Sequence, residues 1–293
     1  MTKEIKLLSK KLKKINDSSS KSDFGSVSII CGSDMYRGCA SLCVSASLRC
    51  GAGITRLCST EKVISSVASK INECTFLPIN EGENGAMCDE DFINKQKLIK
   101  NSDAVLVGCG MTDCVSTNKI VSSILSRLSC PCVIDADALN SIKNCPERLL
   151  YAKRRPIITP HIGEMSRLTG LGVEEIKAER VKVALDFSKK YNCITVLKDS
   201  VTAVTDPEGE VFLNTVENSG LAKGGSGDVL AGIIVSLLGQ GMSSYDSACM
   251  GVLIHSLAGE ICSEQIGKEA MLPSDVINSI SAVFKLVKKE IEK

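Results

Sequence analysis

A glycine-rich segment with one carboxylate carries the strongest chemical signal in this sequence. It runs from Asn218 to Leu230, reads NSGLAKGGSGDVL, and leads directly into an apolar stretch with helical spacing. Glycines let consecutive backbone N–H groups turn toward one anion, and the N-terminus of a following helix adds a partial positive charge. The segment therefore predicts a phosphate site at Gly224–Gly227, although it is not the GxxxxGK[ST] phosphate loop, a pattern that occurs nowhere in the chain.

Asp228 stands in the first turn of the predicted helix, beside this anion site. A carboxylate repels phosphate, so it is unhelpful for phosphate binding alone. It is useful if it takes a proton from a hydroxyl group that then attacks a phosphoryl group. The alternative is that Asp228 only caps the helix, which is worth about 0.5–2 kcal/mol. This segment alone leaves catalysis and capping equally open.

A second signal is His161, which follows a short apolar run in the segment IITPHIGEM. A strand is expected to end at Thr159, and a helix is expected to open at Gly163-Glu164. In an open α/β sheet, ligands bind where the carboxyl ends of the strands meet the loops, so His161 would face the site. Taken singly, a structural loop histidine is the favoured interpretation. His255 lies within an apolar helical stretch, and there a packing role is expected.

Three further strand ends carry polar or glycine residues. Gly108-Cys109-Gly110 would let a ligand approach the backbone closely, and Asp135-Ala136-Asp137 supplies carboxylates that could act through Mg²⁺ and its waters. Lys198 and Asp199 follow another apolar run. Each signal is weak alone, but all of them belong to the carboxyl edge of one sheet, where sites of such folds are assembled.

Short β-branched runs alternate with longer amphipathic runs, a pattern typical of an α/β fold with a mostly parallel sheet covered by helices on both faces. The predicted strands are Val27–Cys31, Ile54–Cys58, Ala104–Val107, Cys132–Asp135, Ile157–Thr159 and Ile194–Leu197. The predicted helices between them are Cys39–Arg49, Glu61–Asn72, Asp91–Lys100, Cys114–Leu128 and Glu174–Tyr191.

The pattern changes after Lys198. Thr202–Thr205 and Glu210–Leu213 are short β-like runs joined by the turn sequence DPEG, which predicts an antiparallel hairpin within residues 202–214. Three helices should follow, over Gly227–Leu238, over Tyr245–Glu264, and from Pro273 onward. Because no linker or composition break divides the chain, residues 23–293 are expected to form a single catalytic domain.

Composition narrows the class of protein. The chain has 293 residues, 35 Lys plus Arg against 34 Asp plus Glu, and 3% aromatic residues without Trp. This balance gives no reason to expect nucleic-acid binding. The 15 cysteines form no Cys-x-x-Cys pair and stand mostly where Val or Ala would fit, so buried reduced thiols are expected rather than disulfides or metal ligands. With no secretory signal at the N-terminus, a cytoplasmic location is expected.

Residues 1–22 are predicted to form an N-terminal helix and a flexible turn. Leu7, Leu8, Leu12 and Ile15 form an apolar stripe between lysines, and the stretch from Ser18 to Ser22 resembles a turn. A basic amphipathic helix can lie on a membrane. One this short is more often docked on its own domain, so no membrane partner is expected.

Taken together, these motifs resemble the ribokinase-like superfamily and, within it, the ADP/ATP-dependent NAD(P)H-hydrate dehydratases. The resemblance covers about residue 20 to the C-terminus. Its most specific pieces are Thr159-Pro160-His161-x-Gly163-Glu164 and Lys223-Gly224-Gly225-Ser226-Gly227-Asp228. Further matching pieces are Gly32-Ser33 with Met35 and Gly38–Gly53, Gly108-x-Gly110, Asp135–Leu139, Val196–Lys198 and Leu221-Ala222.

The resemblance implies a repair reaction on a damaged cofactor, the S epimer of NADH or NADPH hydrated at C6. Members of the family remove the water at the expense of a nucleotide, and the free-standing bacterial type converts ADP to AMP. The hydroxyl group would be phosphorylated and then leave as phosphate. Mg²⁺, a cytoplasmic location and a homo-oligomer, specifically a tetramer, are further implications. No direct metal ligand is assigned.

The resemblance also implies the site residues. Ala40, Gly110, His161 and Asp228 correspond to residues that line the hydrated dinucleotide, and Asp228 is the catalytic one. The nucleotide-binding set is Lys198, Asp199, Ser200, Val201, Thr202, Gly224, Gly225, Ser226 and Gly227. The chain departs from the family pattern at Cys109 and Ile162, where proline is usual, at Met111, where leucine is common, and at 217–219. None of these changes removes a group assigned to chemistry.

Two alternatives stay open at this point. A ribokinase-like kinase acting on a thiazole or pyrimidine alcohol would share the fold, the anion loop and Asp228, but its phosphorylated product would persist. A non-catalytic nucleotide-binding protein would bind ligand without releasing phosphate. Larger family members carry an added epimerase domain, for which this chain has no room, so a separate epimerase is an expected partner.

Overall fold

The computed structural model describes residues 2–12 and 20–293. Nine strands form one sheet in the order β3-β2-β1-β4-β5-β6-β7-β8-β9. All pairs from β3 to β7 are parallel, and β8 and β9 are added antiparallel. The strands are β1 (Ser26–Ile30), β2 (Ile54–Ser59), β3 (Cys74–Pro78), β4 (Ala104–Val107), β5 (Cys132–Ile134), β6 (Ile157–Ile158), β7 (Ile194–Leu197), β8 (Thr202–Thr205) and β9 (Val211–Asn214).

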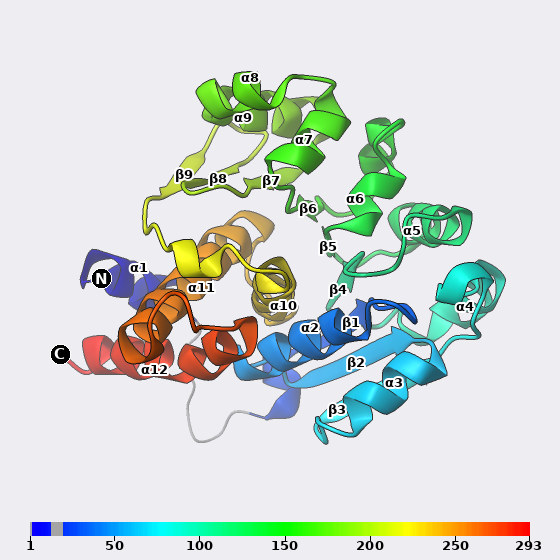
Figure 1. The fold of residues 1–293 in the computed structure, drawn as a ribbon, viewed down its shortest axis with the longest axis horizontal. Coiled ribbons are helices and arrows are strands. Elements are labelled where there is room, and N and C mark those ends of the chain that lie inside the picture. Colours follow the sequence, from blue (N-terminus) through cyan, green and yellow to red (C-terminus); the bar gives the residue numbers. More distant parts are fainter. Residues whose placement is uncertain (1, 13–19) are drawn as a thin grey trace.

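Helices cover both faces of the sheet (Figure 1). One face carries α1 (Thr2–Lys11), α2 (Arg37–Arg49), α3 (Glu61–Ala68), α10 (Ser226–Gly239), α11 (Ser244–Ile266) and α12 (Pro273–Ile291). The other face carries α4 (Asp89–Lys95), α5 (Val115–Arg127), α6 (Asp137–Ser141), α7 (Ile162–Thr169), α8 (Val173–Ala178) and α9 (Arg180–Tyr191). Short 3₁₀ turns span Lys21–Phe24, Glu83–Gly85, Gln96–Leu98, Pro146–Tyr151 and Ser219–Leu221. This is the α/β architecture that the sequence predicts, a mostly parallel sheet covered by helices on both faces.

The central strands are apolar throughout because both of their faces are covered. Every residue of β4 and of β7 is buried. The two faces have separate cores, and α10 lies at the centre of one of them, against α2. Their backbones approach so closely at Gly232 that a Cβ there would lie 2.5 Å from the carbonyl oxygen of Cys43. This close approach fixes the start of α10 relative to α2.

Most of the predicted elements agree with the structure, although helix α6 was not predicted. All six predicted strands and the hairpin are present. Strand β3 was not predicted, since it lies at the edge of the sheet, is only partly buried and ends at a proline, Pro78. The helix predicted over Glu174–Tyr191 is instead two helices, because Glu179 leaves helical geometry at φ −115° and ψ 29°. The helix predicted over Asp91–Lys100 begins earlier and becomes a 3₁₀ turn at Gln96.

The N-terminal helix α1 packs on α11 and α12. Leu8 is fully buried and Ile5 nearly so, and Lys11 pairs with Asp246 at 2.9 Å. The N-terminal helix is therefore docked on its own domain. Ile15 and the start of the predicted turn lie outside the described residues, and Lys21–Phe24 form a 3₁₀ turn. Within residues 2–12 and 20–293, no helix has the length and apolarity needed to span a bilayer.

All fifteen cysteines lie in the described ranges and are free thiols. Ten of them are buried. The burial of these ten agrees with the expectation that most cysteines act as small core residues. Several of these thiols gather beside Asp228, which the spacing of the cysteines in the sequence did not predict.

Candidate active site

The predicted site residues meet at the carboxyl edge of the sheet. The loops after β4, β5, β6 and β7 are neighbours there because these four strands are consecutive in the sheet. The N-terminus of α10 faces the same edge, since Gly227 lies beside Lys198 and Asp135. In Figure 1 this region lies between α10 and the ends of β5, β6 and β7.

Asp228 lies in the first turn of α10, as predicted. The turn is possible because Gly225, at φ 96°, takes the left-handed conformation that glycine adopts without strain. Asp228 makes no side-chain cap to the helix, since the cap position belongs to Gly225, which has no side chain. The capping alternative for Asp228 therefore has no support, and its carboxylate remains available for chemistry.

Burial and, to a smaller extent, the neighbouring Asp135 carboxylate raise the pKa of Asp228 from 3.8 to about 7. A hydrogen bond from Cys109 and the charge of Lys198 act in the opposite direction. A carboxylate with such a pKa exchanges its proton near neutral pH. That is the property required of a general base.

Lys198 and Asp135 form a buried ion pair at the centre of the site. Lys198 Nζ lies 2.9 Å from Asp135 Oδ1, and the two side chains are 19% and 2% exposed. Burial lowers the pKa of Lys198, but the carboxylates of Asp135 and Glu164 outweigh this effect, so its pKa is raised. Lys198 is therefore a fixed positive charge beside Asp228.

Because Gly227 has no side chain, the space next to this ion pair stays open. A Cβ built on it would lie 3.3 Å from Lys198 Nζ and 3.8 Å from Asp135 Oδ2. A Cβ on Gly224 would meet no atom within 4 Å. The glycines at these two positions therefore keep the surface open where the loop meets the lysine, as an anion site requires.

His161 is the N-cap residue of helix α7. Its Nδ1 accepts hydrogen bonds from the backbone N–H groups of Gly163, at 3.0 Å, and Glu164, at 3.2 Å, and the backbone N–H of His161 donates to the Glu164 carboxylate at 2.8 Å. Burial and the charges of Lys198 and Arg167 lower the pKa of His161. The neutral ring thus caps the helix through Nδ1 and keeps its side chain 54% exposed at the site.

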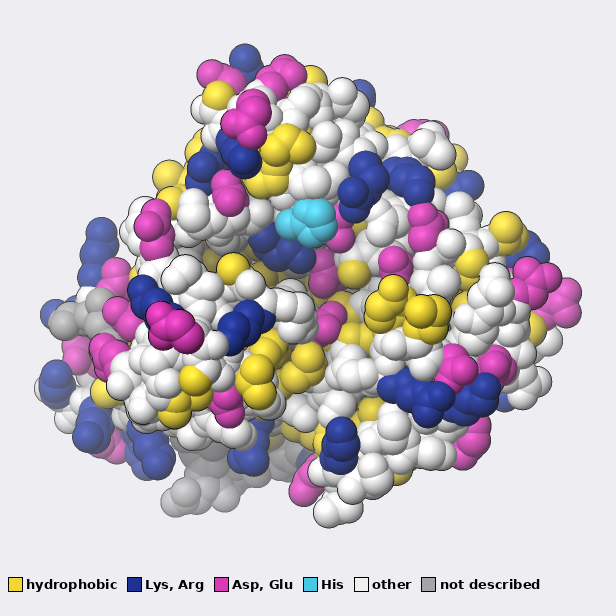
Figure 2. Space-filling model, viewed as in Figure 1, with side chains coloured by type: hydrophobic (Ala, Val, Ile, Leu, Met, Phe, Trp, Pro, Cys, Tyr) yellow, Lys and Arg dark blue, Asp and Glu magenta, His cyan; other side chains and the backbone are white. Residues whose placement is uncertain are grey.

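Figure 2 shows an exposed histidine at the edge of a hollow, next to basic and acidic side chains. This histidine is His161, because His255 is 8% exposed within α11. The prediction of a packing role for His255 holds. Its Nε2 also lies 3.3 Å from the Ser226 hydroxyl, so it supports the glycine loop from behind.

The loops after β4 and β5 pack on each other without room for side chains. A Cβ on Gly108 would lie 1.9 Å from the carbonyl oxygen of Asp135, and one on Gly110 would lie 2.3 Å from Cys39 Sγ. Ala136, between the two aspartates, has φ 50°, a strained value for a residue with a side chain. Tight packing therefore sets the position of Asp135 in the site.

The segment from Lys198 to Thr202 is the loop between β7 and β8. Asp199 and Ser200 are exposed, and Val201 and Thr202 are half-buried. Arg180, which begins α9, holds this loop through the Val201 carbonyl at 3.2 Å and the Asp199 carboxylate at 3.4 Å. No motif pointed to Arg180, because it lies in a predicted helix away from this loop in the sequence.

Two residues are placed differently from what their motifs suggest. Ala40 is fully buried in α2, so its assignment to the substrate rests on the resemblance. Lys223 turns away from the glycine loop, and its Nζ donates to the carbonyl oxygens of Glu269 and Met271 at 2.6 and 2.8 Å. Lys223 therefore anchors the loop to the segment before α12.

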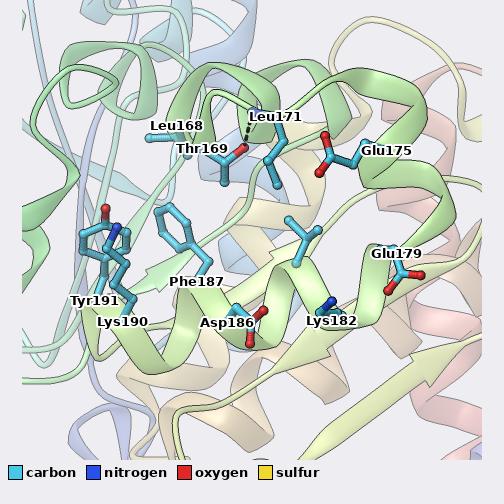
Figure 3. Close-up of a pocket in the computed structure, with 11 residues that line it drawn as sticks. Leu168, Thr169, Leu171, Glu175, Glu179, Lys182, Asp186, Phe187, Lys190 and Tyr191 are labelled. Atoms are coloured by element: carbon cyan, nitrogen blue, oxygen red, sulfur yellow. Dashed lines mark hydrogen bonds between the residues drawn. The ribbon is translucent and has the colours of Figure 1, made fainter.

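A separate pocket lies between the end of α7 and helices α8 and α9 (Figure 3). It is lined by Leu168, Thr169, Leu171, Glu175, Glu179, Lys182, Val183, Asp186, Phe187, Lys190 and Tyr191. None of these residues belongs to the predicted site. The mixed charges of its rim provide no convergent polar group, so we assign it no role in the chemistry.

Comparisons with known proteins bear on this site. Residues 27–282 match the model of the NAD(P)H-hydrate dehydratase family. An ADP-dependent (S)-NAD(P)H-hydrate dehydratase of Neisseria meningitidis is 32% identical over 87% of this chain and 83% of the relative. An ADP/ATP-dependent NAD(P)H-hydrate dehydratase of Bacillus subtilis, co-crystallized with ATP and Mg²⁺, is 25% identical with a TM-score of 0.81, and 97% of each chain is covered.

Other relatives are longer. A bifunctional NAD(P)H-hydrate repair enzyme of Thermofilum pendens is 32% identical over 93% of this chain but only 52% of its own length. The chain thus spans about half the length of the bifunctional relatives it matches. A hydroxyethylthiazole kinase of Pyrococcus horikoshii, 14% identical with a TM-score of 0.58, shares the fold alone. With its motifs, its fold and a family match over most of its length, this chain belongs to the NAD(P)H-hydrate dehydratase family.

Proposed function

We propose that this protein restores hydrated NADH and NADPH, acting on the S epimer of the C6 hydrate and using ADP, which becomes AMP. The observation that carries the proposal is the carboxylate of Asp228, half-buried at the start of α10 with a pKa of about 7, beside the Lys198–Asp135 pair. The names of the relatives support the substrate and the nucleotide.

Asp228 accepts the proton of the C6 hydroxyl group in the proposed reaction. The hydroxyl oxygen then attacks the terminal phosphorus of ADP, forming a C–O–P linkage while the bond to the AMP oxygen breaks. Transfer of a phosphoryl group depends on positioning and on stabilising negative charge. A carboxylate within the first turn of α10 lies beside the amides that would hold the phosphoryl oxygens.

The nucleotide is held by the loop between β7 and β8 and by the glycine loop. Residues 198–202 and Gly224–Gly227 are the proposed contacts to the nucleotide, and Gly227 lies beside the Lys198 ammonium. Lys198 offsets the charge of the terminal phosphate and leaves Asp228 free to act as base. Ala40, Gly110 and His161 are the proposed contacts to the hydrated dinucleotide.

The second stage expels phosphate. Hydroxide is a poor leaving group, whereas phosphate leaves readily when the lone pair of the ring nitrogen pushes electrons toward C6. Breaking the C6–O bond and losing a proton from C5 restores the reduced nicotinamide ring. This stage distinguishes the proposed reaction from that of a kinase, whose phosphorylated product persists.

Magnesium fits the chemistry of the donor set. Asp135 and Asp137 present hard carboxylate oxygens beside the glycine loop, and such oxygens suit Mg²⁺, which usually keeps several waters. Asp135 is already paired with Lys198, and Asp137 accepts a hydrogen bond from the Thr112 N–H at 2.9 Å. These two residues would hold the ion through water, and the ion would supply charge neutralisation for the phosphates.

Partners and location complete the proposal. A separate NAD(P)H-hydrate epimerase is proposed as a partner from the family resemblance, and some relatives are named bifunctional repair enzymes. A homo-oligomer, specifically a tetramer, and a cytoplasmic location are proposed from the family resemblance.

The deciding assay incubates the protein with hydrated NADH, ADP and Mg²⁺. Recovery of absorbance in the reduced-nicotinamide band, with one AMP and one phosphate formed per ring restored, is the expected result. ATP in place of ADP tests the nucleotide choice. A phosphorylated dinucleotide that accumulates without regaining absorbance would identify a kinase, and ligand-induced thermal stabilisation without phosphate release would identify a binding protein.

A further inference from the structure

Two buried thiols stand beside the Asp228 carboxylate. Cys43 comes from α2, Cys109 from the loop after β4, and Asp228 from α10, and one ligand atom of each lies within 4.8 Å of the others. Cys109 and Cys43 have no exposed surface. Three chain segments thus bring together a soft donor set, two sulfurs and one carboxylate oxygen.

We propose that Cys43, Cys109 and Asp228 form an inhibitory binding site for a thiophilic divalent cation, Zn²⁺. In a tetrahedral zinc site, with Zn–S of about 2.3 Å and Zn–O of about 2.0–2.2 Å, neighbouring ligand atoms lie roughly 3.5–3.8 Å apart. The observed spread is within about 1 Å of this distance. Zinc binding therefore requires the ligand atoms to move closer together by up to about 1 Å.

The thiols are protonated without metal. Burial raises the pKa of Cys43 well above its ordinary value, and a hydrogen bond with Cys43 together with burial raises that of Cys109. A bound dication favours the thiolate over the protonated thiol, because its positive charge offsets the negative charge that is unfavourable in the protein interior. Binding of one Zn²⁺ forms two zinc–thiolate bonds and releases the two thiol protons.

The site accepts zinc and rejects magnesium. Thiolate is a poor ligand for Mg²⁺ and a good one for Zn²⁺. With three protein ligands and a fourth position left over, the site has the open coordination of a non-structural zinc site. Zinc bound here occupies the carboxylate of Asp228, which then cannot accept a proton. Reversible inhibition that excess Mg²⁺ does not relieve is the consequence, and this part rests on the proposed function.

A third buried thiol, Cys31, hydrogen-bonds Cys43, but its sulfur is not among the ligand atoms that lie within 4.8 Å of one another. Cys39 Sγ donates to the Tyr36 carbonyl at 2.7 Å and to the Cys109 carbonyl at 3.3 Å, so it is already engaged. Cys50, at the end of the same helix α2, is buried and interacts with Ser236. Cys50→Ala is therefore a matched control for Cys43→Ala, since each removes one buried thiol from one helix.

The test uses Cd²⁺ as a spectroscopic probe and Zn²⁺ as competitor. Wild type and Cys50→Ala are expected to bind one Cd²⁺ per chain with a thiolate charge-transfer band, which Zn²⁺ displaces. Cys43→Ala should weaken binding at least about 10²-fold, a loss reached even when an outer-shell partner is removed. Asp228→Asn, which keeps both thiols, should weaken binding as well.

Binding and inhibition are measured separately, so the two proposals fail separately. Absence of the band in the wild type, or equal Cd²⁺ binding by wild type and Cys43→Ala, overturns the metal site. In the hydrate assay, Zn²⁺ should inhibit wild type and Cys50→Ala but not Cys43→Ala, and a chelator selective for zinc should restore the rate. No activity in the presence of Mg²⁺ and the absence of Zn²⁺ and Cd²⁺ would refute the proposed function. The Cd²⁺ charge-transfer band would still decide whether the metal site exists.

Discussion

Lys198 and Asp135 join the ends of β7 and β5 across the strand between them, with 2.9 Å from Nζ to Oδ1. The pair lies under Gly227 and beside Asp228. One ion pair therefore fixes the relative positions of two strand ends and sets the charge next to the candidate base.

Replacing Lys198 by methionine should destabilise the protein. Asp135, 2% exposed, would keep its charge without a partner, and breaking a buried pair costs about 3–5 kcal/mol. We expect the lower end of this range, because the lysine side chain retains some exposure. Chemical denaturation measures the free energy of unfolding. The double variant Lys198→Met with Asp135→Asn should recover part of the loss, and wild-type stability in the single variant would contradict a structural role for the pair.

Asp228→Asn should preserve the fold and lose turnover. The side chains have the same shape, but the amide cannot accept the hydroxyl proton, so kcat should fall at least about 10²-fold, the lower end for general base catalysis. Asp113→Asn is the control, because it neutralises an exposed carboxylate that pairs with Lys143 on the surface. A wild-type rate in Asp228→Asn would remove Asp228 from the chemistry.

The pH dependence of the reaction follows from the same group. Because the pKa of Asp228 is about 7, kcat/KM should rise as pH increases through 7 and then level off. Stability should change in the opposite direction. Between pH 3.8 and pH 7 the folded state holds a proton on Asp228 that the unfolded state has released. The free energy of unfolding therefore decreases as pH rises through this range.

Denaturation of wild type and Asp228→Asn at several pH values checks this sign. The variant should gain stability relative to wild type between about pH 4 and pH 7, and the difference should stay constant above that. A difference that is independent of pH would mean that Asp228 is ionised throughout and is not the group with the raised pKa.

The sequence predicts the edge of the sheet where the site forms, because apolar runs mark the strands and polar residues follow them. Asp135, His161 and Lys198 each stand within three residues of the end of a short apolar strand. Their pairing was not predictable, since Lys198 follows β7 and Asp135 follows β5, and only the order of strands in the sheet brings them together. Asp137, foreseen as a carboxylate of the site, lies on the same edge.

The thiol cluster and the contacts of Arg180 were not predictable either, because they join segments that are far apart in the sequence. Cys43 and Cys109 are 66 residues apart, and the close packing of α2 on α10 that brings Cys43 to Asp228 depends on Gly232, a glycine without a local signature. The cap that His161 makes was also not predicted. Sequence reasoning contrasted a structural loop histidine with a residue of the site, and in the structure Nδ1 caps α7 while Nε2 lies 3.6 Å from the Glu164 carboxylate. The role of His161 at the site stays a prediction.

Substitutions at His161 separate these two roles. Asparagine can replace Nδ1 as the acceptor of the helix cap but has no imidazole ring. Alanine removes both the cap acceptor and the ring, and loss of the cap should cost about 1 kcal/mol of stability. His161→Asn should therefore unfold like wild type while raising KM for the hydrated dinucleotide. His161→Ala should show both defects. If His161→Asn has wild-type kinetics, the histidine acts only as a cap.

Gly227→Ala tests whether the space above Lys198 is the nucleotide site. Gly227 lies in the first turn of α10 without a positive φ, and its Cβ would lie 3.3 Å from the flexible end of Lys198, so the fold should tolerate the methyl group. The same methyl would occupy the place where a terminal phosphate must approach the lysine. We expect an unchanged melting temperature and an ADP KM raised at least about tenfold, a difference of 1.4 kcal/mol. Gly172→Ala, at the start of α8 in open space, is the matched control. Unchanged ADP kinetics in Gly227→Ala would place the terminal phosphate away from Lys198, because a bound phosphate at hydrogen-bond distance from the ammonium cannot share that volume with the methyl group.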